Sequence, residues 1–175
     1  MTKLLLGIVT AIIVLCFQFQ VARAESQYVL PYPSQMPGSI FYKLSLIQEE
    51  LLRFWYFGDF GQFKYNLQQA DKHLVEAKTL FDYKQYLLAY KALGNSNTYF
   101  KKIGPTLVSA KKNGKNTLDK EKILKEAAKK HTEELVKLKQ YLPPAFEWKP
   151  EKQKARILNL SDLFENSIKI RQEAL

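Results

Sequence analysis

An apolar stripe between residues 60 and 81 constrains the fold of this chain more than any other feature of its sequence. Apolar side chains recur there at alternating steps of three and four residues: Phe60, Phe63, Leu67, Ala70, Leu74, Ala77 and Phe81. This spacing puts them along one side of an α-helix of more than about five turns, close to the heptad seam of antiparallel bundles. Small alanines in the stripe allow a neighbouring helix to approach closely. The stripe therefore predicts a long helix packed inside a helical bundle.

Helical periodicity continues through most of the remaining chain. We expect helices from residue 40 to about 57, from about 82 or 83 onward, from about 117 to 142, and a shorter one that opens at Asn159 or Ser161. Two of them carry stripes of the same kind, Phe41, Leu44, Ile47, Leu51 and Trp55 in the 40–57 helix, and Leu124, Ala127, His131, Leu135, Leu138 and Leu142 in the 117–142 helix. Gly104-Pro105 predicts either a break or a kink in the helix that begins at about residue 82 or 83.

These elements predict an all-α fold. It is an antiparallel bundle of about four long helices plus a short C-terminal helix, formed by residues 39–175 as one domain. Residues 145–158 are expected to be irregular, because no stretch alternates long enough to predict a strand. Prolines keep residues 25–38 extended. This Pro-rich lead either lies across the bundle, burying Tyr28, Leu30 and Tyr32, or acts as a spacer from a membrane.

Residues 1–24 have the three parts of a signal peptide. A lysine precedes an almost entirely apolar run over residues 4–17, and Ala22-Arg23-Ala24 has small residues at the positions that a signal peptidase reads. Cleavage is expected before Glu25, which predicts an extracytoplasmic protein, secreted or tethered to the membrane. The apolar run is shorter than the roughly 20 residues of a bilayer span. Extending it to Ala22 gives the alternative, an uncleaved anchor.

The positive charge of the chain is concentrated in one segment. The whole sequence has 27 Lys+Arg against 17 Asp+Glu, a formal net charge of +10. Residues 25–100 are neutral, with seven basic and seven acidic residues, whereas residues 101–139 hold twelve lysines, five acids and no arginine, a net +7. Arginine forks make the bidentate contacts of specific nucleic-acid readers. Their absence from the basic segment argues against a nucleic-acid partner.

Lysine-rich helical faces are usually solvated surfaces, or attract anionic membranes and polymers without reading a specific structure. We expect this segment to contact an anionic surface through Lys111, Lys112, Lys115, Lys122, Lys125, Lys129 and Lys130. The expected partner is an anionic surface polymer or membrane of the cell envelope, or alternatively another envelope protein.

Two His-x-x-Glu pairs are the candidate metal ligands. His131 lies in the apolar stripe of its helix, with Glu134 one turn later. The alternative function is therefore a ligand- or metal-carrying bundle around His131 and Glu134, although a hydrogen-bonded core histidine is the favoured interpretation. His73 and Glu76 lie about 90° and 150° from the stripe of their helix, so this second pair is expected to face solvent.

No motif predicts an enzyme. The single cysteine, Cys16, lies in the signal peptide, so the mature chain has no disulfide, no haem-attachment motif and no thiolate metal site. The sequence also contains no Gly-x-Ser-x-Gly elbow and no Gly-rich phosphate loop. We therefore expect no cofactor and no catalytic site, with a hydrolase assembled from scattered residues as a third hypothesis.

Three segments resemble a known family: Leu30–Gly38, Trp55–Gly58 and Ala70–Leu80. They are similar to exported bacterial helical proteins catalogued as domain of unknown function 5667, over roughly residues 30–139. The resemblance implies an extracytoplasmic bacterial helical domain and carries over no catalytic residues. Together with the residue-level evidence, it predicts a non-enzymatic interaction or structural protein of the cell envelope.

Overall fold

The computed structural model describes residues 25–33, 40–152 and 154–174 of the chain. The predicted signal peptide and residues 34–38 of the Pro-rich lead lie outside the described residues. The described elements are the helices α2 (Ile40–Trp55), α3 (Gly58–Asp82), α4 (Tyr86–Lys112), α5 (Leu118–Tyr141) and α6 (Leu160–Gln172), and the strands β1 (Ala145–Trp148) and β2 (Arg156–Asn159). The predicted fold class is confirmed, with four long helices and a shorter C-terminal one. Within these residues, no helix combines the length and hydropathy that crossing a membrane requires.

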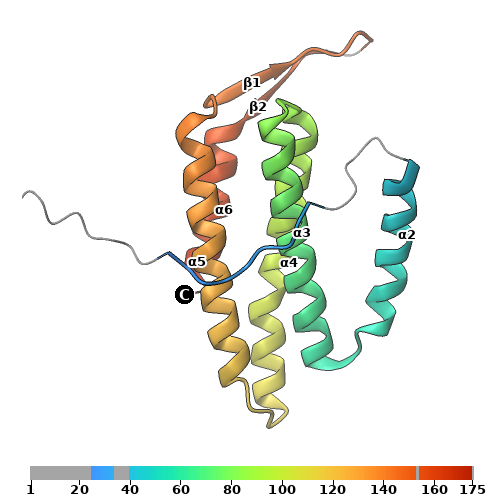
Figure 1. The fold of residues 1–175 in the computed structure, drawn as a ribbon, viewed down its shortest axis with the longest axis vertical. Helices are drawn as coiled ribbons and strands as arrows, with labels where there is room; N and C mark the ends of the chain where they lie inside the picture. The colour runs from blue at the N-terminus through green and yellow to red at the C-terminus, as the bar shows by residue number, and fades with distance from the viewer. Residues whose placement is uncertain (1–24, 34–39, 153, 175) are drawn as a thin grey trace, which may run out of the picture.

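The core lies between two helix pairs, α3 with α4 and α5 with α6 (Figure 1). The predicted stripe of α3 is buried from Phe63 to Phe81, with no member more than 6% exposed, and only Phe60 at its start is half-buried. The stripe of α5 is likewise buried from Leu124 to Leu138. Spacing alone thus identified the core-facing sides of α3 and α5.

The apolar stripe of α2 does not face this core, contrary to the expectation from its spacing. We call Phe41, Leu44, Ile47, Leu51 and Trp55 the α2 stripe; its side chains are between 61% and 80% exposed. α2 contacts α3 through a different side, on which Glu49 forms an ion pair with Lys72 and its carbonyl accepts a hydrogen bond of 3.4 Å from the Tyr65 hydroxyl. The inner side of α3 already packs against α4, so α2 meets only the polar outer side.

α4 starts later than predicted and runs through the expected interruption. The chain turns between α3 and α4 at Lys84, whose φ of 59° is in the left-handed region. Pro105 lies inside α4, which is one continuous helix, so the break that Gly104-Pro105 allowed does not occur. Proline removes one helical N–H. The buried Ile103 and Leu107 on either side anchor both halves of the helix to the core.

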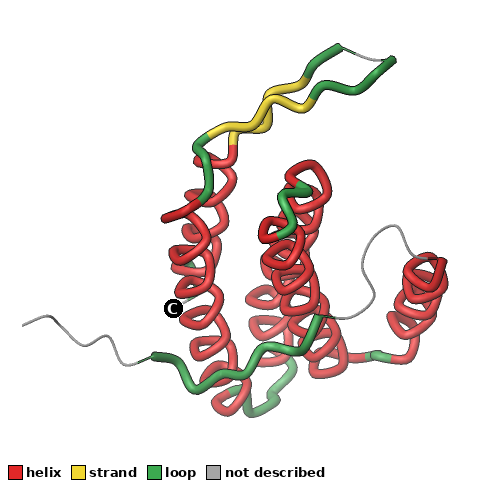
Figure 2. The backbone as a smooth tube through the Cα atoms, turned by 45° about the horizontal axis from the view of Figure 1, so that its top comes forward, coloured by secondary structure: helices red, strands yellow, loops and turns green. Residues whose placement is uncertain are grey.

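A short hairpin replaces the irregular segment predicted after α5. β1 and β2 pair antiparallel, with Phe146 opposite Leu158. Leu158 is 1% exposed and belongs to the core, and the Phe146 ring lies 4.4 Å from that of Tyr86. The hairpin extends from the end of the bundle where α5 finishes and α6 begins (Figure 2). Four residues per strand are too few for an alternating pattern to stand out in the sequence.

Candidate functional site

Five of the seven predicted contact lysines form no ion pair with another described residue. We call these five the lysine surface: Lys111 and Lys112 at the end of α4, and Lys122, Lys125 and Lys129 on α5. All are exposed except Lys129, which is half-buried. The three on α5 follow steps of three and four residues, about 150° from the buried stripe of that helix. The fold therefore gathers them on one outward side of α5.

The other two predicted lysines are engaged by carboxylates. Lys115 pairs with Asp59 at 2.9 Å, and its hydrogen bond is the main reason that the pKa of Asp59 falls to about 2. Lys130 lies 3.0 Å from Glu25 and 3.5 Å from Glu134. Carboxylates at the start of α3 and in the Pro-rich lead neutralise their charge. These two lysines hold the fold together rather than extending the lysine surface.

The Pro-rich lead docks across α5 and α3 at its first residues. Ser26 is 7% exposed; its backbone N–H donates to Glu133 Oε1 at 2.9 Å and its hydroxyl donates to the Glu126 carbonyl at 2.9 Å. The Tyr28 hydroxyl donates to Asp71 Oδ2 on α3 at 2.6 Å. Tyr32, in contrast, is 95% exposed. The first residues of the lead thus lie across the bundle, the first of the two predicted arrangements, but Tyr32 is not buried as that prediction expected.

A groove of about 660 Å³ lies between this lead and α5. Lys122 and Lys129 of the lysine surface line it together with Tyr28 and Ile123. A neighbouring groove of about 610 Å³ shares Tyr28 and Ile123, and is lined mainly by apolar residues of α3, with further lysines from both helices. The lysine surface therefore borders hollows with an apolar floor.

The structure does not bring His131 and Glu134 to a common ligand position. Glu134 directs its oxygens to three lysines, at 2.5 Å from Lys78, 3.3 Å from Lys137 and 3.5 Å from Lys130. Burial opposes ionisation of Glu134, but hydrogen bonds and the charges of Lys78 and Lys137 outweigh it and lower its pKa. Among the described residues, no group of three or more His, Cys, Asp or Glu side chains is placed to hold a metal.

His131 is a fully buried partner of Asp71. Its Nε2 lies 2.7 Å from Asp71 Oδ1, while its Nδ1 is buried without a hydrogen-bond partner among the described residues. Burial is the largest influence on the pKa of His131 and lowers it, although the hydrogen bond to Asp71 acts in the opposite direction. Asp71 accepts from both His131 and Tyr28. This arrangement ties the lead, α3 and α5 together in the core.

A second buried polar cluster centres on Arg171 of α6, a residue that no sequence motif marks. Its guanidinium donates to Asn97 Oδ1, to the Ser167 carbonyl at 3.2 Å and to Ser96 Oγ at 2.8 Å. It also lies 4.8 Å from the Phe100 ring centre. Burial lowers the pKa of Arg171 to about 9. These contacts join α6 to α4, and the side chain is 0% exposed.

The prediction that His73 and Glu76 face solvent is wrong. Both residues are 4% exposed, and His73 Nδ1 lies 2.8 Å from Glu76 Oε2. The Tyr99 ring of α4 stacks on His73, with ring centres 5.7 Å apart. A helical wheel of α3 locates the apolar stripe, but it does not show that an aromatic side chain from α4 covers the flank beside the stripe.

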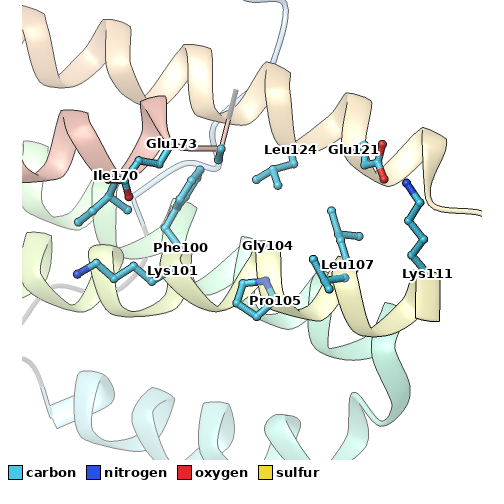
Figure 3. Close-up of a pocket in the computed structure, with 12 residues that line it drawn as sticks. Phe100, Lys101, Gly104, Pro105, Leu107, Lys111, Glu121, Leu124, Ile170 and Glu173 are labelled. Carbon is cyan, nitrogen blue, oxygen red and sulfur yellow. The ribbon is translucent and has the colours of Figure 1, made fainter. Parts of the chain in front are cut away.

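A further pocket of about 450 Å³ lies between α4, α5 and the end of α6 (Figure 3). Its apolar lining includes Phe100, Leu107, Leu124 and Ile170, and two lysines and two glutamates also line it. No histidine, cysteine or hydroxyl side chain lines this pocket. Its walls therefore suit an apolar or amphiphilic group and provide none of the usual triad nucleophiles.

Comparison with known proteins gives one family assignment. Residues 34–145, more than half of the chain, match the family model described as Domain of unknown function (DUF5667). No curated protein and no solved structure matches the chain.

Proposed function

Because the chain belongs to the DUF5667 family, whose description assigns no activity, we propose a function from the surface of the fold itself. The protein is an exported, non-enzymatic helical domain that binds an anionic surface of the bacterial cell envelope. The lysine surface contacts the anionic partner, and the helical bundle fixes the positions of these lysines. Export rests on the signal-peptide pattern of residues 1–24.

The observation that supports this proposal is the division of the predicted lysines into two sets. Lys115 and Lys130 already have carboxylate partners, whereas the five residues of the lysine surface have none among the described residues. Exposed ammonium groups that form no ion pair with a described carboxylate attract polyanions over several ångströms, and Glu25 and Glu126 line the groove beside Lys122 and Lys129. Flexible ammonium groups impose little geometry, which suits a repetitive anionic polymer or lipid headgroups.

A salt series of binding measurements tests the proposal. Vesicles of phosphatidylglycerol and phosphatidylcholine, and purified anionic wall polymer, are titrated separately so that the two sources of negative charge are distinguished. The triple substitution Lys122→Gln, Lys125→Gln and Lys129→Gln should weaken binding about a hundredfold, at about 1 kcal/mol for each lysine near the surface. Lys115→Gln is the matched control, because its partner is Asp59, and it should have a much smaller effect.

Binding should weaken steeply as salt is raised, because exposed charges are screened. A binding affinity that does not change with salt concentration, or that the triple substitution leaves unchanged, would contradict the proposal. That result would favour a protein partner in the envelope that recognises another surface.

A further inference from the structure

α2 presents its apolar side to solvent. The α2 stripe lies about 150° around the helix from the side that carries Tyr42 and Glu49. That opposite side faces α3, where Lys72 pairs with Glu49 and also lies 6.0 Å from the Tyr42 ring centre. The contact with α3 therefore fixes α2 with its apolar side outward.

The exposed apolar area of α2 is large for a monomer. Leu44, Ile47 and Leu51 are 62%, 61% and 67% exposed, and Trp55 is 80% exposed. Phe41 and Phe54 on the same side are 64% and 71% exposed. Together these six side chains expose about 700 Å² of apolar surface, if a whole aromatic side chain is taken as about 200 Å² and an aliphatic one as somewhat less. The largest apolar patch of a typical monomer is about 300–600 Å², and a standard interface buries about 800 Å² on each partner.

The spacing of the stripe is symmetric along the helix. Leu44 and Leu51 lie equally far from the point between residues 47 and 48, and so do the aromatic residues Phe41 and Phe54. A two-fold interface requires that residue i meets residue j of the second copy while j meets i. Two antiparallel α2 helices that cross near Ile47 satisfy this requirement, because each Leu44 then packs against Leu51 of the second copy.

We propose that the α2 stripe is a homodimer interface in which two copies of α2 pack antiparallel about a two-fold axis near Ile47. The charge of α2 favours a second copy over a membrane. Its sixteen residues contain two basic and two acidic side chains, a net charge of zero, whereas helices that lie in a membrane interface are rich in Lys and Arg. α2 also lies on the far side of α3 from α5, the helix that carries Lys122, Lys125 and Lys129 of the lysine surface (Figures 1 and 2).

Sedimentation of the purified, processed protein over about 1 to 100 µM tests the dimer. The wild-type protein should sediment as a dimer, and Leu51→Glu should raise the dissociation constant at least about a hundredfold, because the pairing would bury an unpaired carboxylate in each copy. Ile157→Glu is the matched control, since Ile157 is 72% exposed on the hairpin. Far-UV circular dichroism should be nearly unchanged in both variants, because neither site is buried in the bundle.

Cysteine cross-linking of the processed protein tests the antiparallel register, because no cysteine remains once residues 1–24 are removed. Ile47→Cys should form a disulfide with its own copy. Leu44→Cys should not, because the two equivalent positions lie about 10 Å apart along the axis, beyond disulfide reach. A monomer across the whole concentration range, a dimer that Leu51→Glu leaves intact, or equal cross-linking at both positions would overturn the proposal. The proposal would also be overturned if the protein bound vesicles as a monomer and Leu51→Glu abolished that binding, because the α2 stripe would then be a lipid-binding surface.

Discussion

Acidification below pH 6.5 should destabilise the folded protein through His131. This imidazole is fully buried, and its Nε2 lies 2.7 Å from Asp71 Oδ1. A second proton would have to sit on Nδ1, which has no acceptor in the part of the chain that the structure describes. Burial therefore lowers the pKa of His131 below its ordinary value of 6.5 in the folded state. As the pH falls, the unfolded chain takes up the proton first.

The size of the effect follows from proton linkage. Between pH 6.5 and the lower folded-state pKa, only the unfolded chain binds the proton, so the free energy of unfolding falls by about 1.4 kcal/mol for each pH unit. The loss accumulates at this rate as the pH falls below 6.5, and it stops growing once the folded protein also binds the proton. The contribution of His131 is fully present above pH 6.5 and is lost on acidification.

Urea unfolding of the wild type and of His131→Gln at pH 7, 6 and 5, at constant ionic strength, measures this difference. Glutamine keeps a side-chain N–H for Asp71 and does not titrate, so its free energy of unfolding should fall less steeply with acid. His73→Gln, which removes the other histidine, should retain the wild-type contribution of His131. Parallel pH dependences for the wild type and His131→Gln would refute the reasoning. They would mean that the pKa of His131 is the same in the folded and the unfolded protein.

Three further predictions use the same unfolding assay. Tyr28→Phe should lower the free energy of unfolding by about 1.5–3 kcal/mol, because the hydroxyl donates to the Asp71 carboxylate, and a loss below about 0.5 kcal/mol would contradict the docked lead. Gly94→Ala should raise the free energy of unfolding by about 0.5–1 kcal/mol, because an added Cβ meets nothing within 4 Å. Gly61→Ala should lower it, because the added Cβ would lie 2.9 Å from the backbone carbon of Tyr56. Equal effects of the two substitutions would contradict this geometry. Leu158→Ala should cost about 2–5 kcal/mol, and a neutral result would mean that the hairpin does not close the core.

The spacing of apolar residues predicted the helices but not their neighbours. The stripes of α3 and α5 and the α2 stripe have the same three- and four-residue steps, yet only the first two are buried. Periodicity shows which side of a helix is apolar, whereas the partner of that side depends on competition for the limited inner surface of the bundle. α4 takes the inner side of α3, and α2 meets the polar flank around Lys72.

The buried polar pair was partly readable from the sequence. His131 lies within the apolar stripe of α5, whereas Asp71 lies about 80° around α3 from the centre of its stripe. A polar residue within a buried stripe needs a hydrogen-bond partner, because burying it alone is costly, so His131 implied a polar partner on a packed helix. The missing information was the relative register of α3 and α5. Tyr28, which reaches Asp71 from the lead, had no periodicity to mark it.

The proposed α2 dimer would strengthen binding of the lysine surface to a long polyanion. The helices α2 and α5 lie on opposite sides of α3 (Figures 1 and 2). An antiparallel α2 dimer therefore leaves both sets of α5 lysines outward and accessible. A dimer with two weak, lysine-driven contacts binds a continuous polyanion far more tightly than either half, because the second contact forms at a high effective concentration. Leu51→Glu should then reduce apparent affinity for a long anionic polymer, but leave binding to a polymer too short to reach both sets unchanged. Equal loss for both lengths would show that the substitution acts on the lysine contact itself.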